Sequence, residues 1–139
     1  MTKKKILLID EEYWSIEPII DRIQNTFGKD TVVYCADGAE GLKMLLQYEF
    51  ACIILDIMFP LGSFLETDEN EGDSINSGLI ILKRLRENLK CRIPVICFTI
   101  RDDDQAKSEI KKYDDSYHIS KLNPRAIDIL INQIRILIN

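Results

Sequence analysis

The sequence has little histidine, no paired cysteines and no long hydrophobic run. Its single histidine, His118, and its four cysteines, none in a C-x-x-C pair, leave few ligands for a zinc or other transition-metal site. Three of the cysteines lie in apolar, strand-like runs, where cysteine serves as a small hydrophobic residue. The apolar run after the basic start spans only Ile6 to Ile9, too short for a signal peptide or a membrane span. We therefore expect a cytoplasmic protein with no membrane association.

Excess basic charge is missing as well. The 18 basic and 23 acidic residues give a net charge of −5, which offers no basic field for direct nucleic-acid binding. The whole excess lies in residues 61–77, a polar segment with five carboxylates and no Lys or Arg. The length of 139 residues predicts one domain over residues 1–139, with 61–77 as an acidic insertion. The insertion is either a functional loop or a solvated polar one.

Apolar, strand-like runs alternate with amphipathic helical patterns five times. Ser15 is expected to cap the first helix, with Pro18 in its first turn and Gly28 at its end. The alternation predicts an α/β protein with a doubly wound parallel sheet and right-handed crossovers. The expected strands cover residues 5–9, 31–36, 51–56, 92–99 and 117–120, and the expected helices cover 15–28, 38–47, 79–89, 102–112 and 124–138.

Polar side chains stand at the ends of these strands. Asp10 and Glu11 follow the first strand, Asp56 ends the third, Thr99 ends the fourth and Lys121 follows the fifth. Any single Asp in such a place is most often a turn or helix cap, but the carboxyl ends of parallel strands share one edge of the sheet. Three carboxylates there repel one another unless a cation joins them, and an oxygen-only site suits Mg²⁺. Lys121 and Thr99, opposite the metal, would bind the oxygens of a phosphoryl group, and Asp56 would be the nucleophile.

These residues, with the run Leu55-Asp56-Ile57-Met58-Phe59-Pro60, closely resemble the receiver domain of bacterial two-component response regulators. The resemblance spans nearly the whole chain and implies a flavodoxin-like (βα)5 fold with strand order 2-1-3-4-5. It implies that Asp56 is the phosphoacceptor and that Thr99 and Lys121 assist it. The implied Mg²⁺ ligands are Asp10, Glu11, Asp56 and the backbone carbonyl of Met58. The implied switch residues are Thr99 and His118, with Tyr117 as the alternative to His118.

The resemblance also implies a regulatory function. A histidine kinase or phosphotransfer protein would phosphorylate Asp56, and the surface around the fourth helix, fifth strand and fifth helix would switch to engage a downstream protein target. Such a module promotes only its own phosphorylation and dephosphorylation, so it is not an enzyme in the ordinary sense. We find no output domain, which fits either a stand-alone regulator or a fragment. Ile129 and Ile136 project from the fifth helix opposite its core face and could form a homodimer contact.

Departures from the family pattern leave rival readings open. Glu11 stands where Asp is usual, Ile100 where a small residue is usual, and Leu122 where proline is usual. The departures at Glu11 and Ile100 allow a pseudo-receiver, a protein-binding module that works without phosphorylation. A hydrolase of the haloacid-dehalogenase kind is disfavoured, because that family has a second Asp at the position of Met58.

Overall fold

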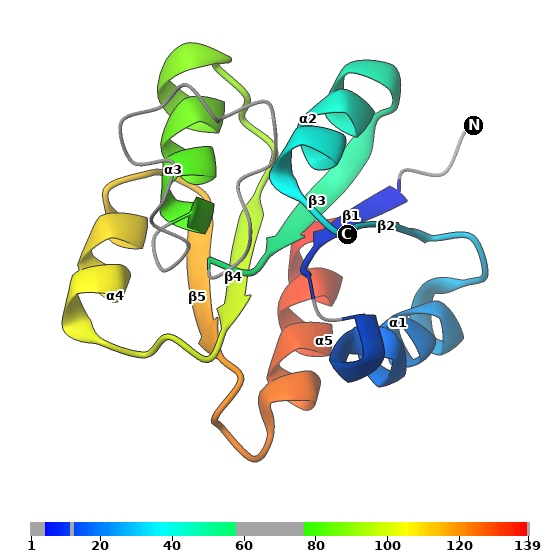
Figure 1. Cartoon of the computed structure of the whole chain (residues 1–139). Helices are drawn as coiled ribbons and strands as arrows, with labels where there is room; N and C mark the ends of the chain where they lie inside the picture. The colour runs from blue at the N-terminus through cyan, green and yellow to red at the C-terminus, as the bar shows by residue number, and fades with distance from the viewer. Residues whose placement is uncertain (1–4, 12, 58–76, 139) are drawn as a thin grey trace.

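The computed structural model describes residues 5–11, 13–57 and 77–138, so the predicted insertion and the Met58 carbonyl lie outside the described residues. Five parallel strands form one sheet in the order β2-β1-β3-β4-β5, which confirms the predicted flavodoxin-like α/β fold (Figure 1). The strands are β1 (Lys5–Ile9), β2 (Val32–Cys35), β3 (Phe50–Leu55), β4 (Val95–Thr99) and β5 (Ser116–Ser120).

Helices cover both faces of the sheet (Figure 1). The α-helices are α1 (Tyr13–Phe27), α2 (Gly38–Gln47), α3 (Ser77–Lys83), α4 (Asp104–Lys111) and α5 (Ala126–Ile138), and a π-helical turn, η3 (Arg84–Asn88), continues α3. Successive residues of β1 point to opposite faces, so Ile6 packs with α1 and α5 whereas Leu7 packs with α2, α3 and α4. Burial on both faces explains why the strands are apolar runs without polar alternation.

The helix boundaries correct part of the sequence interpretation. α1 begins at Tyr13, so Ser15 lies inside the helix and does not cap it, and Pro18 is the sixth helical residue instead of a first-turn residue. Capping preference is a weak local signal, and docking of the helix on the sheet overrides it here. Gly28 ends α1 as predicted, with a φ of 120°. Aspartate side chains cap two other helices: Asp37 accepts a hydrogen bond from the Glu40 N–H at the start of α2, and Asp103 accepts one from the Ala106 N–H at the start of α4.

The π-helical turn is a second difference from the sequence interpretation. The Leu89 N–H donates to the Arg84 carbonyl at 2.9 Å, five residues back, where an α-helix would bond four residues back. The wider turn buries two consecutive residues, Leu85 and Arg86, which helical periodicity would not place on one face. The helix ends before Leu89, a residue that is 49% exposed, so the predicted third helix over residues 79–89 extends one residue too far.

The buried cysteines behave as small hydrophobic residues, as the sequence suggested. Cys35, Cys52 and Cys97 lie in strands, are free thiols and are buried. Burial raises the pKa of each thiol to about 12, so the thiolate form needed for metal binding or nucleophilic attack is suppressed at neutral pH.

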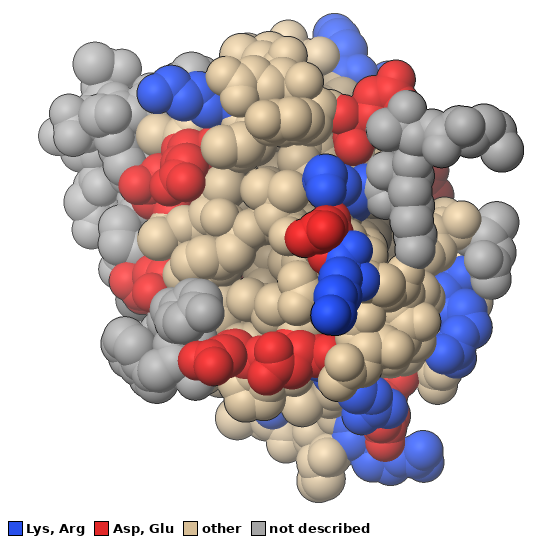
Figure 2. Space-filling view, turned by 90° about the vertical axis from the view of Figure 1, so that its right-hand side faces the viewer, with Lys and Arg blue, Asp and Glu red and all other residues tan. Residues whose placement is uncertain are grey.

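Acidic and basic side chains are interspersed around uncharged surface on the face shown in Figure 2. Among the described helices, none combines the length and the apolar character that a membrane crossing requires.

Candidate functional site

Backbone pairing brings the ends of the strands together at one edge of the sheet. The Asp56 N–H donates to the Ile9 carbonyl at 3.0 Å, which fixes the residue after β3 beside the end of β1. The Lys121 N–H donates to the Thr99 carbonyl at 2.8 Å, which fixes the residue after β5 beside the end of β4. Four residues singled out in the sequence therefore stand on the same edge: Asp10, Asp56, Thr99 and Lys121.

The ammonium of Lys121 joins the two carboxylates at this edge. Its Nζ lies 2.7 Å from Oδ2 of Asp10 and 3.4 Å from Oδ2 of Asp56. Both carboxylates are buried, with Asp10 1% and Asp56 7% exposed. One side chain from the end of β5 thus contacts residues that follow β1 and β3, which lie 111 and 65 residues earlier in the sequence.

Opposing effects set the charge state of Lys121. Burial lowers its pKa, but the charges and hydrogen bonds of Asp56 and Asp10 outweigh burial, so the pKa stands above its ordinary value. The ammonium also lies 5.6 Å from the centre of the Phe98 ring, at a distance suited to a cation–π contact. Lys121 is therefore positively charged at neutral pH, and it faces two carboxylates with a single ammonium.

The donor set of this site is suited to a hard divalent cation. Asp10 and Asp56 offer carboxylate oxygens at one point, and their negative charge favours a cation. Glu11, the third predicted carboxylate, is exposed. Within residues 5–11, 13–57 and 77–138, no three His, Cys, Asp or Glu side chains are grouped so as to hold a metal ion. The fit to Mg²⁺ accordingly depends on Asp10 and Asp56.

Thr99 and His118 are linked through the backbone of one residue, Arg101. Thr99 is fully buried, and its hydroxyl accepts a hydrogen bond from the Arg101 N–H at 3.2 Å. Nε2 of half-buried His118 lies 2.8 Å from the Arg101 carbonyl oxygen, which it can engage only as a donor. Tyr117, the alternative switch residue, instead donates its hydroxyl to Asp115 at 3.2 Å. His118 therefore has a path to Thr99, whereas the hydroxyl of Tyr117 is engaged beyond the opposite end of β5.

Two residues that support the site were missed in the sequence. The Tyr34 hydroxyl donates to the Asp10 carbonyl at 2.6 Å, which holds the backbone after β1 from the neighbouring strand β2. The Gly78 N–H donates to the Ile57 carbonyl at 3.1 Å, so α3 begins directly against the backbone that follows Asp56. The strand-like run over residues 31–36 identified Tyr34 only as part of a strand, and a glycine near a helix start carries no signal of close approach.

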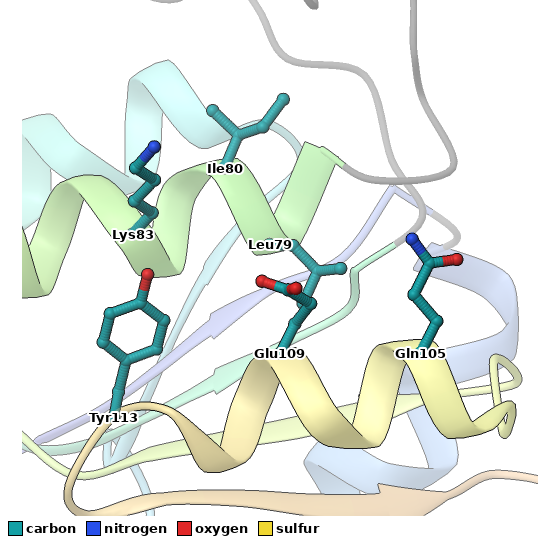
Figure 3. Close-up of a pocket in the computed structure, with 6 residues that line it drawn as sticks. All are labelled: Leu79, Ile80, Lys83, Gln105, Glu109 and Tyr113. Carbon is teal, nitrogen blue, oxygen red and sulfur yellow. The ribbon is translucent and has the colours of Figure 1, made fainter.

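Lys121 also lines a cavity of about 400 Å³ on the α1 and α5 side of the sheet. Leu122 lines the same cavity and is 66% exposed, and Ile100 is 53% exposed, so both departures from the family pattern are surface residues. A separate cavity of about 200 Å³ lies between α3 and α4, and Figure 3 shows its lining side chains, among them Lys83, Glu109 and Tyr113. None of the predicted site residues lines this second cavity.

Comparison with known proteins reveals similarity at the level of structure. A scan against models of known protein families finds no match, and neither does a search of curated protein sequences. Three solved structures illustrate what the fold resembles. The receiver domain of the Francisella response regulator 1452 is 23% identical with a TM-score of 0.75, and the match covers 98% of this chain and 97% of that one. The Vibrio cholerae chemotaxis protein CheY4 is 19% identical with a TM-score of 0.74, over 98% of this chain and 99% of that one.

The response regulator protein TrrA from Thermotoga maritima, solved in complex with Mg(2+)-BeF, is 21% identical with a TM-score of 0.72, over 97% of this chain and 99% of that one. The resemblance drawn from the strand-end residues is thereby confirmed for the fold over nearly the full chain. This chain has the fold of a CheY-like response regulator receiver domain.

Proposed function

We propose that this chain is the phosphoacceptor module of a two-component phosphorelay in the cytoplasm, and that Asp56 is its phosphorylation site. The observation that carries the proposal is the double contact of Lys121 with Asp10 and Asp56, beside the buried hydroxyl of Thr99. An aspartate that only caps a turn or a helix would not need a second buried carboxylate beside it. It would also not need an ammonium that contacts both carboxylates.

In the proposed reaction, a phosphohistidine on a histidine kinase or phosphotransfer protein is the donor. An oxygen of the Asp56 carboxylate forms a bond to phosphorus, the phosphorus–nitrogen bond breaks, and its electron pair stays on the imidazole of the donor. Lys121, already within 3.4 Å of Asp56, neutralises charge on the transferred oxygens, and the Thr99 hydroxyl donates a hydrogen bond to one of them. Asp56 needs no general base, because it reacts as a carboxylate.

Asp10, Glu11, Asp56 and the backbone carbonyl of Met58 would hold Mg²⁺ in this proposal. When bound, the ion supplies positive charge that offsets the repulsion between the carboxylates and the incoming phosphoryl group.

The same contacts suggest how phosphorylation would reach the surface. Movement of the Thr99 hydroxyl toward the phosphoryl group would break its hydrogen bond with the Arg101 N–H. Arg101 also accepts the hydrogen bond of His118 through its carbonyl, so a shift of this residue frees His118 on β5. The surface of α4, β5 and α5 would then change for a downstream protein target.

Labelling with acetyl phosphate and Mg²⁺ tests the proposal. We expect an acid-stable, base-labile phosphoryl group on the wild-type protein and none on the Asp56→Asn variant. Lys121→Gln should keep the acceptor but slow the labelling, since the ammonium that meets the phosphoryl oxygens is gone. Labelling of the Asn variant would show that another residue is the acceptor. Absence of labelling in the folded wild type would instead support the pseudo-receiver alternative.

A further inference from the structure

A basic cavity of about 490 Å³ lies at the opposite end of the sheet from Asp56. Arg92, just before β4, and Asp114, just before β5, both line it, whereas the proposed phosphorylation site lies beyond the other ends of these strands. The strands between the two sites are five residues long, or about 16 Å at ~3.3 Å per residue. A ligand in this cavity would not contact Asp56.

The charge of the cavity is opposite to that of the whole chain. Among the residues that the structure describes, its lining holds four cations and two carboxylates, in a protein whose net charge is −5. One of the carboxylates, Glu87, accepts the hydroxyl hydrogen of Tyr113 at 2.8 Å. Both signs are present, but the balance favours an anion. The cations are Arg86, Lys90, Arg92 and Lys112.

Three of these cations have no carboxylate partner among the described residues. In the part of the chain that the structure describes, no carboxylate lies within 4.0 Å of the charged groups of Arg86, Lys90 or Arg92. Lys112 differs, because its ammonium pairs with Glu109 at 2.8 Å. The charges of Arg86, Lys90 and Arg92 are therefore not neutralised by an ion pair among the described residues.

Arg86 forms a rigid wall of the cavity. Its side chain belongs to the π-helical turn and only 4% of the residue is exposed. The guanidinium donates to the backbone carbonyls of Cys91 at 2.8 Å, Asp115 at 3.1 Å and Asp114 at 3.3 Å. Burial lowers its pKa, and the positive charge of Arg92 acts in the same direction, although the charge of Asp115 opposes both. The positive group is thus fixed in place by carbonyl dipoles and not by an ion pair.

We propose that this cavity binds a small ligand carrying two or more phosphate groups. The volume lies within the range of about 300–1,000 Å³ typical of small-molecule sites. Guanidinium groups match the geometry of phosphate oxygens, and lysine adds a mobile charge, so Arg92 and Lys90 would engage separate phosphates beside the fixed Arg86. The ligand would join η3 to the segment between α4 and β5. This inference does not depend on phosphorylation of Asp56.

Inorganic pyrophosphate is the probe for the test. It is titrated into the full chain without divalent metal, at constant ionic strength, while backbone amide shifts are followed by NMR. We expect saturable shifts confined to residues 84–92 and 112–116. The double variant Lys90→Gln, Arg92→Gln should weaken binding at least tenfold, because two charge-assisted contacts are lost. Both side chains are exposed, so the variant should fold, as its thermal midpoint will verify.

The matched control is Lys29→Gln, Lys43→Gln, which removes the same charge from two exposed lysines that do not line the cavity. It should bind pyrophosphate within about twofold of the wild type, since only long-range attraction is reduced. Equal weakening by both double variants would reduce the effect to general electrostatics and overturn the proposal. So would unsaturable shifts, or shifts centred on Asp10 and Asp56.

Discussion

Replacement of Gly78 by alanine tests how closely α3 approaches the backbone after Asp56. A Cβ at this position would overlap Cα of Ile57 and lie 2.6 Å from the Asp56 carbonyl oxygen. Both are main-chain atoms of a segment held by the sheet, so they cannot move aside by a rotamer change. The substitution must therefore shift either the start of α3 or the chain at Asp56.

Two opposing effects set the expected change in the free energy of unfolding. Overpacking in a well-packed interior typically destabilises by about 1–3 kcal/mol, and contact with backbone atoms belongs at the upper end of that range. Exchange of glycine for alanine within a helix recovers up to about 1 kcal/mol. We expect Gly78→Ala to lower the free energy of unfolding by about 2 kcal/mol. For a domain of this size that loss lowers the thermal midpoint by about 6–10 °C.

Gly41→Ala is the matched control. Its Cβ would lie 2.5 Å from Cδ1 of Ile9, a terminal methyl group that can rotate at a cost of about 1 kcal/mol. This cost and the gain in helix propensity nearly cancel, so the control should stay within about 1 kcal/mol of the wild type. Urea unfolding followed by circular dichroism compares the two variants. If Gly78→Ala proves no less stable than Gly41→Ala, the inferred close approach of α3 to the backbone of Asp56 and Ile57 is wrong.

Three further predictions concern metal binding, self-association and partner choice. Glu11→Gln should weaken Mg²⁺ binding about tenfold more than Glu12→Gln, measured by fluorescence of the single tryptophan, and equal losses would mean that the acidic pair is misassigned. Ile129 and Ile136 are 39% and 70% exposed on α5, so Ile129→Asp with Ile136→Asp should reduce self-association in sedimentation; a monomeric wild type, with and without a phosphoryl mimic, would refute the dimer face. A short Gly-Ser linker in place of residues 61–77 should leave acetyl phosphate labelling nearly intact but alter phosphorylation by the kinase, most at low salt. Loss of labelling in the folded deletion variant would instead make the segment part of the site.

The sheet could be predicted because the apolar runs that form its strands are visible in short stretches of the sequence. A strand buried on both faces needs an unbroken apolar run, and Cys52 to Leu55 supplies one that ends at Asp56. Order along the chain then placed Asp10, Thr99 and Lys121 at the same edge. Their roles remain predictions, but their proximity follows from parallel pairing alone.

Features that depend on contacts distant in sequence could not be predicted. The π-helical turn has no signature in the leucine spacing, so neither the burial of Arg86 nor the exposure of Leu89 was foreseen. The hydrogen bond from Tyr34 to the Asp10 carbonyl depends on the register of β1 and β2, which the sequence does not specify to the residue. Position along the chain suggested that Lys121 serves Asp56, yet its shorter contact is with Asp10.

The double contact of Lys121 has a consequence for the order of folding. β1 pairs with both β2 and β3, so the strands that bring the two buried carboxylates together all precede Asp56 in the chain. During synthesis the neutralising lysine, 65 residues after Asp56, emerges last of the three. Repulsion between the carboxylates should therefore destabilise the pairing of β1 with β3 at this edge until the lysine arrives. The docking of β5 would complete the sheet and bring the ammonium that offsets this repulsion, so the proposed phosphorylation site would form only when the last strand is in place.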